Sequence, residues 1–203
     1  MELPLYTQWS ICFPQLMDHL WTPWRYAYLA GAHSDERKGV PDELASWPGD
    51  AGCVFCNLLA AAEHALQGGK PIDEVDRAAG IVLRAQHSFI CLNRFPYTSG
   101  HVMILPYSHI GSFAALDAEA AQEITALAQR TETALQQVYS PDGLNMGMNL
   151  GRAAGAGIDG HLHLHILPRW LGDGNFMTAI ADTRVLPETL DTTWERLRAA
   201  FKS

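Results

Sequence analysis

Three histidines alternate with apolar residues in the C-terminal third of the sequence. His161, His163 and His165 are separated by single leucines. In a β-strand, successive side chains point to opposite faces, so the leucines would enter the core and the imidazoles would share the other face, ~7 Å apart. A helix would scatter the same side chains around its circumference. We therefore expect a strand over residues 161–167.

Three kinds of chemistry suit imidazoles in this arrangement. They can be ordinary hydrogen-bonded side chains, they can ligate a metal ion, or the central imidazole can act as a nucleophile while its neighbours orient it and bind an anion. A nucleophile of this kind needs a phosphate cradle nearby. Residues 151–160 are rich in glycine, and glycines let backbone N–H groups approach an anion closely. The residues alone leave all three alternatives open.

Cysteine usage points to free thiols. Cys12, Cys53, Cys56 and Cys91 are too few and too scattered for a disulfide framework in a chain of 203 residues. Cys53 and Cys56 form a Cys-x-x-Cys pair, and this spacing can chelate a metal ion.

The elements that must position these residues form a mixed pattern. Segments rich in β-branched and aromatic residues predict strands at 79–84, 88–93, 101–106, 144–150 and 161–167. A helical stripe predicts a long helix over 116–138, with Asp117 as its cap and Pro141-Asp142-Gly143 as its end. Shorter helices are expected at 55–67 and from about 187 to 201.

Strands joined by short loops around one long helix favour an α+β domain, with an antiparallel sheet of about five strands and additional shorter helices. Residues 1–16 lack periodicity and are expected to lie outside the folded unit as an N-terminal extension. We expect the domain itself to span residues 17–187, with residues 188–203 as a C-terminal helical tail.

Charge and hydropathy narrow the class of partner. The formal net charge is −8, and an acidic protein lacks the basic stripe that binding a nucleic-acid polymer requires. No apolar run reaches the length of a membrane span, and the first residues do not have the pattern of a secretory signal. A cytoplasmic protein without membrane or nucleic-acid partners is therefore expected.

The motifs together resemble one known family. HLHLHILPR is similar to the His-x-His-x-His-x-x pattern of the histidine triad superfamily of nucleotide hydrolases and transferases. The segment FICLNRFPYTSGHVMILPYSHI resembles the family's first half, with Asn93 eight positions before His101. The segments WTPWRYAYL, CVFC and AGAGIDGHLHLHILPRWLGDGNFM resemble the branch of diadenosine tetraphosphate phosphorylases and related hydrolases.

This resemblance implies a role for each matching residue. His163 would attack the α-phosphate and form a nucleotidyl-histidine intermediate, with His165 contacting phosphate oxygens or protonating the leaving group. His161 and His101 would complete the catalytic group. Substrate would be bound by the ribose position, by a polar position near the phosphate chain and by the glycine-rich loop, which are Asn93, Asn149, Gly155, Ala156 and Gly157.

The loop departs from the best-studied hydrolases of the family. Those enzymes carry Gln followed by Ser or Thr where this chain has Ala156 and Gly157. The departure favours a phosphorylase, in which inorganic phosphate enters beside the intermediate and backbone N–H groups replace side-chain contacts. A hydrolase, a nucleoside phosphoramidase, a metal-dependent hydrolase and a nucleotide-binding module without turnover remain as alternatives.

The resemblance also implies a metal site, positive charge beside the substrate and an oligomeric state. Some family members bind zinc through residues that match Cys53, Cys56, His109 and His161, and such a closed site would be structural. The anionic substrate needs local positive charge, for which Arg152 and Arg169 are candidates, and magnesium on the substrate would lower the repulsion. Family members usually pair their sheets edge to edge, so a homodimer is expected.

Overall fold

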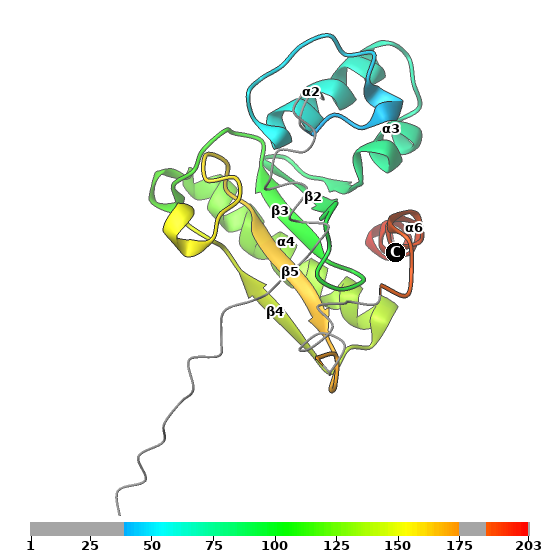
Figure 1. The fold of residues 1–203 in the computed structure, drawn as a ribbon, viewed down its shortest axis with the longest axis vertical. Helices are drawn as coiled ribbons and strands as arrows, with labels where there is room; N and C mark the ends of the chain where they lie inside the picture. The colour runs from blue at the N-terminus through cyan, green and yellow to red at the C-terminus, as the bar shows by residue number, and fades with distance from the viewer. Residues whose placement is uncertain (1–38, 175–185, 203) are drawn as a thin grey trace, which may run out of the picture.

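One antiparallel sheet forms the centre of the protein. The computed structural model describes residues 39–174 and 186–202. The strands of the sheet are β1 (Ile81–Arg84), β2 (Ser88–Leu92), β3 (Val102–Pro106), β4 (Gly143–Gly147) and β5 (Leu164–Arg169). They lie in the order β1-β2-β3-β5-β4, with every neighbouring pair antiparallel (Figure 1). The expected α+β class with five strands is confirmed.

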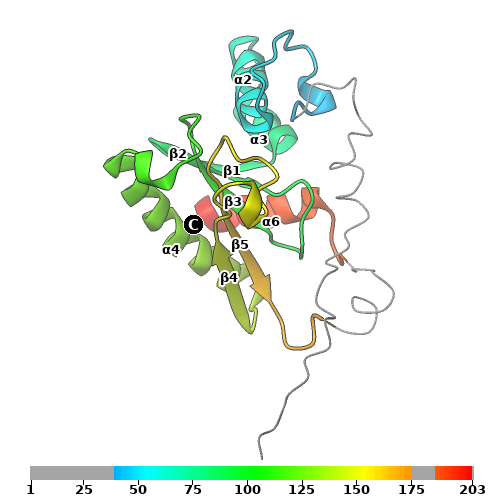
Figure 2. The same ribbon diagram turned by 60° about the vertical axis from the view of Figure 1, so that its left-hand side comes forward.

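Two layers of helices cover the two faces of this sheet. The described helices are η1 (Asp42–Leu44), α2 (Val54–Gln67), α3 (Ile72–Ala79), η2 (Phe113–Ala115), α4 (Ala118–Tyr139), η3 (Arg152–Ala154) and α6 (Leu190–Lys202). The long helix α4 lies along one face, whereas α2 and α3 lie together at the opposite side (Figure 2). None of the helices described is long and apolar enough to cross a membrane.

Strand alternation divides the core between these two layers. Ile90, Ile104 and Ile166 pack with α4, whereas Phe89 and Leu105 pack with α2 and α3. Burial of large apolar side chains on both faces supplies the main driving force for this arrangement. His165 pairs with Met103 across the sheet and therefore faces the α2 side.

The C-terminal helix α6 packs onto the same core. Trp194 and Leu197 are buried in the cluster beneath α4, and the Nε1–H of Trp194 donates to the carbonyl of Ile81 at 2.9 Å. The guanidinium of Arg198 donates to the carbonyl of Val82. Residues 188–202, expected as a tail, thus bind the first strand of the sheet. The N-terminal extension, residues 1–16, lies outside the described residues.

The strand that carries the histidines begins later than the alternation suggested. We expected it over 161–167, but β5 begins at Leu164. The register of β3 and β5 would place Pro106 opposite Leu162, and proline has no N–H to donate to a ladder. The N–H of Leu162 donates instead to the carbonyl of Ile110 at 2.7 Å.

The helices differ from the sequence-based expectations at three points. Asp117 occupies the N-cap of α4, but its side chain makes no capping hydrogen bond with the described residues. The helix α3 was not expected, although Asp73 and Glu74 in its first turn and Gly80 in the left-handed conformation after it are typical helix signals. The final helix begins at Leu190, three residues later than expected.

Candidate nucleotide-binding and metal site

A cavity of about 1070 Å³ opens on the sheet face opposite α4. Its walls come from η1, from α2 and α3, from the first turns of α6 and from the loop between β4 and β5. Sequence-predicted residues that line it are Asn93, Asn149, Gly155, Gly157, His163 and His165. Segments far apart in the sequence therefore bring most of the expected site to one cavity.

The hydrogen on His163 is fixed by the main chain. Its Nδ1 lies 2.9 Å from the carbonyl oxygen of His161 and donates to it, because a carbonyl can only accept. In the neutral imidazole, Nε2 is then the unprotonated nitrogen. The ring of Phe55 contacts the imidazole at a centroid distance of 5.3 Å. His163 is thus oriented as a neutral nucleophile or acceptor in the cavity wall.

His165 is oriented by His101. The backbone N–H of Tyr97 donates to Nδ1 of His101 at 3.1 Å, so the hydrogen of a neutral His101 is on Nε2. That Nε2 lies 3.0 Å from Nδ1 of His165 and donates to it. His165 therefore carries its own hydrogen on Nε2. This chain of hydrogen bonds makes Nε2 of His165 a donor, whereas the carbonyl of His161 leaves Nε2 of His163 as an acceptor. The two imidazoles thus suit an acid–nucleophile pair.

Asn93 holds the turn between β2 and β3. Its Oδ1 accepts the N–H of Phe95 at 2.9 Å, and its backbone N–H donates to the carbonyl of His101. Its Nδ2 lies 3.4 Å from each ring nitrogen of His101. Asn93 thus stabilises the turn that places His101 and also lines the cavity.

Part of the backbone of the glycine-rich loop forms hydrogen bonds within the loop itself. Gly151 and Gly155 have φ angles of +81° and +89°, which favour glycine. The N–H of Gly155 donates to Arg152, and that of Ala156 to Gly151. Ala156 is buried and lies outside the cavity lining, contrary to its expected substrate contact, because its N–H closes the loop. Gly155 and Gly157 line the cavity, with Asn149 packed against Gly155.

Both arginines expected to attract phosphate are paired elsewhere. Arg152 is exposed and forms an ion pair with Asp159 at 2.9 Å. Arg169 lies at the end of β5, where Asp173 and Asn145 accept its hydrogen bonds. Neither residue belongs to the described lining of the cavity. The two side chains that we expected to supply its positive charge therefore lie outside the described lining, and each is paired with an aspartate.

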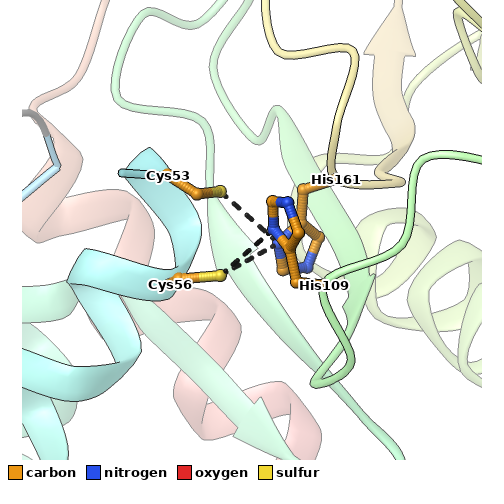
Figure 3. Close-up of side chains that lie close together, drawn as sticks. All are labelled: Cys53, Cys56, His109 and His161. Atoms are coloured by element: carbon orange, nitrogen blue, oxygen red, sulfur yellow. Dashed lines mark hydrogen bonds between the residues drawn. The ribbon is translucent and has the colours of Figure 1, made fainter. Parts of the chain in front are cut away.

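A second cluster adjoins the cavity. The ligand atoms of Cys53, Cys56, His109 and His161 all lie within 4.8 Å of one another. Both cysteines come from the start of α2, and their sulfur atoms point towards the two imidazoles (Figure 3). Cys56 Sγ lies 3.3 Å from Nδ1 of His109, and both sulfurs lie 3.6 Å from Nδ1 of His161.

These distances fit a tetrahedral metal ion. Metal–sulfur and metal–nitrogen bonds of about 2.3 and 2.0 Å place neighbouring ligand atoms roughly 3.3–3.8 Å apart. Nε2 of His161 lies 3.0 Å from the carbonyl of Pro106 and donates to it, which leaves Nδ1 as the unprotonated nitrogen. Burial, with His109 and His163 adding to it, lowers the pKa of His161 and favours the neutral ligand form.

The thiol of Cys56 would lose its proton only beside a cation. Burial raises the pKa of the Cys56 thiol to about 11, and the neighbouring Cys53 adds to the effect. The thiolate is the form that ligates metals, so a bound cation must displace this proton. The donor set of two sulfurs and two imidazole nitrogens is the combination that zinc prefers in closed sites.

Comparison with known proteins decides the family. The HIT domain family matches residues 76–170. The "AP-4-A phosphorylase" of Mycobacterium tuberculosis is 32% identical over 181 residues, which cover 87% of this chain and 80% of that protein. This chain belongs to the histidine triad (HIT) family.

Solved structures agree with this HIT assignment. A zinc-bound histidine triad family protein from Mycobacterium smegmatis is 26% identical, with a TM-score of 0.55 over 76% of this chain and 96% of that one. A hypothetical histidine triad nucleotide-binding protein from Sulfolobus tokodaii, 22% identical, shares the fold with a TM-score of 0.55 over 74% of this chain and 92% of that one.

The structure adds residues that the HIT motifs did not reveal. Tyr97 stacks on His101 at a centroid distance of 4.8 Å and supplies the N–H that fixes its tautomer. Phe55 contacts both His161 and His163 from the first turn of α2. Its position between the two cysteines was a signal, because a residue between Cys53 and Cys56 must lie near the cysteine–histidine cluster.

Proposed function

We propose that this HIT protein cleaves dinucleoside polyphosphates of the diadenosine tetraphosphate type by transferring a nucleotidyl group through His163. One observation carries the proposal: His163 and His165 line the same cavity with opposite hydrogen positions. The similarity to an "AP-4-A phosphorylase" supports the choice of substrate class.

The chemistry has two steps. In the first, Nε2 of His163 attacks the α-phosphorus, a nitrogen–phosphorus bond forms, and the bond to the bridging oxygen breaks. A nucleoside triphosphate leaves when the substrate is a tetraphosphate. In the second step, inorganic phosphate attacks the same phosphorus and releases a nucleoside diphosphate from His163. Water in place of phosphate would release a nucleoside monophosphate.

His165 acts on the leaving oxygen. Its Nε2–H is directed by the chain of hydrogen bonds from Tyr97 through His101, so it donates to the bridging oxygen as negative charge develops there. His163 cannot serve as this donor, because its hydrogen is held by the carbonyl of His161. The carbonyl also stabilises the positive charge that His163 acquires on phosphorylation.

The nucleoside end of the substrate would lie against the part of the cavity wall that α2 forms. Val54, Phe55 and Leu58 of α2 give that wall apolar side chains that suit a base. The amide of Asn93 both donates and accepts, as the two ribose hydroxyls require. Asn149 and the glycines of the loop lie on the phosphate side, with Gly155 and Gly157 in the lining.

We further propose that the cysteine–histidine cluster binds one zinc ion. Four protein ligands close the coordination shell, so the ion supplies structural stabilisation. It would tie the start of α2 to the segment before β5 and hold His161, whose carbonyl positions the nucleophile. No step of the reaction passes through the metal.

The deciding experiment is incubation of diadenosine tetraphosphate with the protein, with and without inorganic phosphate. We expect ATP and ADP only when phosphate is present. ATP and AMP without phosphate would identify a hydrolase of the same mechanism. The absence of all cleavage would refute the proposed function.

Two variants separate chemistry from folding. His163→Ala should abolish turnover while nucleotide binding and the midpoint of thermal unfolding stay close to wild type. His87→Ala is the matched control, because His87 lies at the turn before β2, away from the cavity lining. A His163→Ala protein with full activity would eliminate the nucleotidyl-histidine step.

We also propose a homodimer formed through β4. This strand ends the sheet and is paired only with β5 among the described strands. Its sequence, GLNMG, has no charged residue or proline to block a second strand, and Met146 is 49% exposed. Light scattering should give twice the chain mass of 22.3 kDa, and Met146→Lys should shift the mass towards the monomer.

A further inference from the structure

Nearly every cation in the described part of the chain has an acidic partner. Lysines and arginines paired with Asp or Glu are Lys70, Arg77, Arg84, Arg152, Arg169, Arg196, Arg198 and Lys202. The two exceptions are Arg94 and Arg130. Arg130 lies on α4 with its guanidinium 5.9 Å from the ring centroid of Phe201, away from the cavity lining.

Arg94 is different because it lines the cavity. It lies between Asn93 and Phe95, whose N–H is accepted by the Asn93 side chain at 2.9 Å. This local hydrogen bond holds the turn on which Arg94 stands. The side chain of Arg94 is exposed, so it can reach a ligand without leaving a packed position.

The other cations of the lining are offset by acids that also line it. Lys70 pairs with Glu74, and Arg77 pairs with Asp191. The protein as a whole has a formal charge of −8. An anionic substrate entering this cavity therefore meets one positive side chain in the described lining that no described carboxylate offsets. Asp42 and Glu43 also line the cavity, so the attraction for an anion must come from this one cation rather than from a basic lining as a whole.

We propose that Arg94 is a substrate-binding residue that attracts and holds the anionic phosphate chain of the nucleotide. This inference rests on the proposed function, since it requires a nucleotide polyphosphate in the cavity. Arg94 takes the place that sequence reasoning gave to Arg152 and Arg169. It acts on binding and leaves the bond-breaking step to the histidines.

The test compares equilibrium binding of AMP, ATP and diadenosine tetraphosphate, measured by calorimetry, to wild type, Arg94→Gln, Arg94→Lys and Arg130→Gln. Arg130→Gln is the matched control because it removes the same charge outside the cavity. At low ionic strength, Arg94→Gln should weaken tetraphosphate binding about tenfold. AMP binding should weaken less, and Arg94→Lys should retain most of the affinity.

Salt provides a second readout. The difference between wild type and Arg94→Gln should shrink as ionic strength rises, because salt screens an exposed charge. Equal binding by Arg94→Gln and Arg130→Gln would overturn this inference and leave the proposed function standing. An equal, salt-independent loss for AMP and tetraphosphate would overturn it in favour of a base contact. Failure of wild type to bind any nucleotide would overturn both.

Discussion

The Nε2 of His101 lies 3.0 Å from Nδ1 of His165, although 64 residues separate them in the sequence. The other nitrogen of His101 accepts the N–H of Tyr97. A main-chain amide therefore determines, through one intervening imidazole, which nitrogen of His165 can donate. Backbone groups set the hydrogen positions of both cavity histidines, since the carbonyl of His161 does the same for His163.

Replacing His101 should impair chemistry more than binding. His101→Ala removes the donor to His165, so kcat should fall about 100-fold while KM changes little. His101→Gln should recover part of the loss, since its amide can donate to the same nitrogen. Steady-state kinetics across pH give the measurement. An unchanged kcat in His101→Ala would contradict a positioning role.

Removal of zinc should lower the thermal stability of the protein. Protein purified without chelator should contain one zinc per chain, and Cys56→Ser should lose it. Because the four ligands join three separate segments, loss of the metal should lower the midpoint of thermal unfolding by about 5–10 °C. Cys91→Ser, which changes a buried thiol outside the cluster, should retain the metal. Metal analysis that finds no zinc in freshly purified wild type would argue against the site.

Gly100 should tolerate no side chain. Its φ is +77°, and an added Cβ would lie 2.8 Å from the Tyr139 ring. Gly100→Ala should therefore destabilise the protein by about 1–3 kcal/mol and displace His101, the next residue. Gly143→Ala is the control, because its Cβ would meet nothing within 4 Å. Chemical denaturation measures both, and equal stability of the two variants would disprove the conformational argument.

Glu188 should make the free energy of unfolding depend on pH. Burial alone would raise the pKa of Glu188, but hydrogen bonds from Tyr139, Thr193 and Arg196 outweigh burial and lower it. A carboxyl with a lowered folded pKa contributes stability above its unfolded pKa and loses it as pH falls through the folded value. Glu188→Gln should cost about 1–2 kcal/mol at pH 7, and the cost should shrink below pH 4. Parallel urea titrations at the two pH values test this, and a cost that is constant with pH would refute it.

Local sequence signals predicted the fold, and they predicted several residues that the structure brings together in the candidate site. The alternation of residues 161–165 predicted a shared face for His163 and His165, which both line the cavity. The Cys-x-x-Cys spacing and the family resemblance together predicted the cysteine–histidine cluster. The signals for α3 were also present in Asp73, Glu74 and Gly80, but their short span gave too little periodicity to recognise.

Long-range pairing could not be predicted. Whether an arginine attracts substrate depends on which acids the fold brings beside it, and the sequence could not show that Arg152 and Arg169 are paired with aspartates. The start of β5 likewise depends on the proline that the sheet register places opposite it. The fixed tautomers of the histidines depend on carbonyls that no side-chain pattern encodes.

His161 divides its work between atoms that mutagenesis treats differently. Its imidazole faces the cysteines, whereas its carbonyl belongs to the peptide backbone and survives every substitution. An alanine at this position would delete the proposed metal ligand while sparing the acceptor of the His163 hydrogen. A cysteine would offer another sulfur to the proposed zinc ion. Comparing His161→Ala with His161→Cys would therefore separate the effect of losing the metal from the effect of misaligning the His163 imidazole.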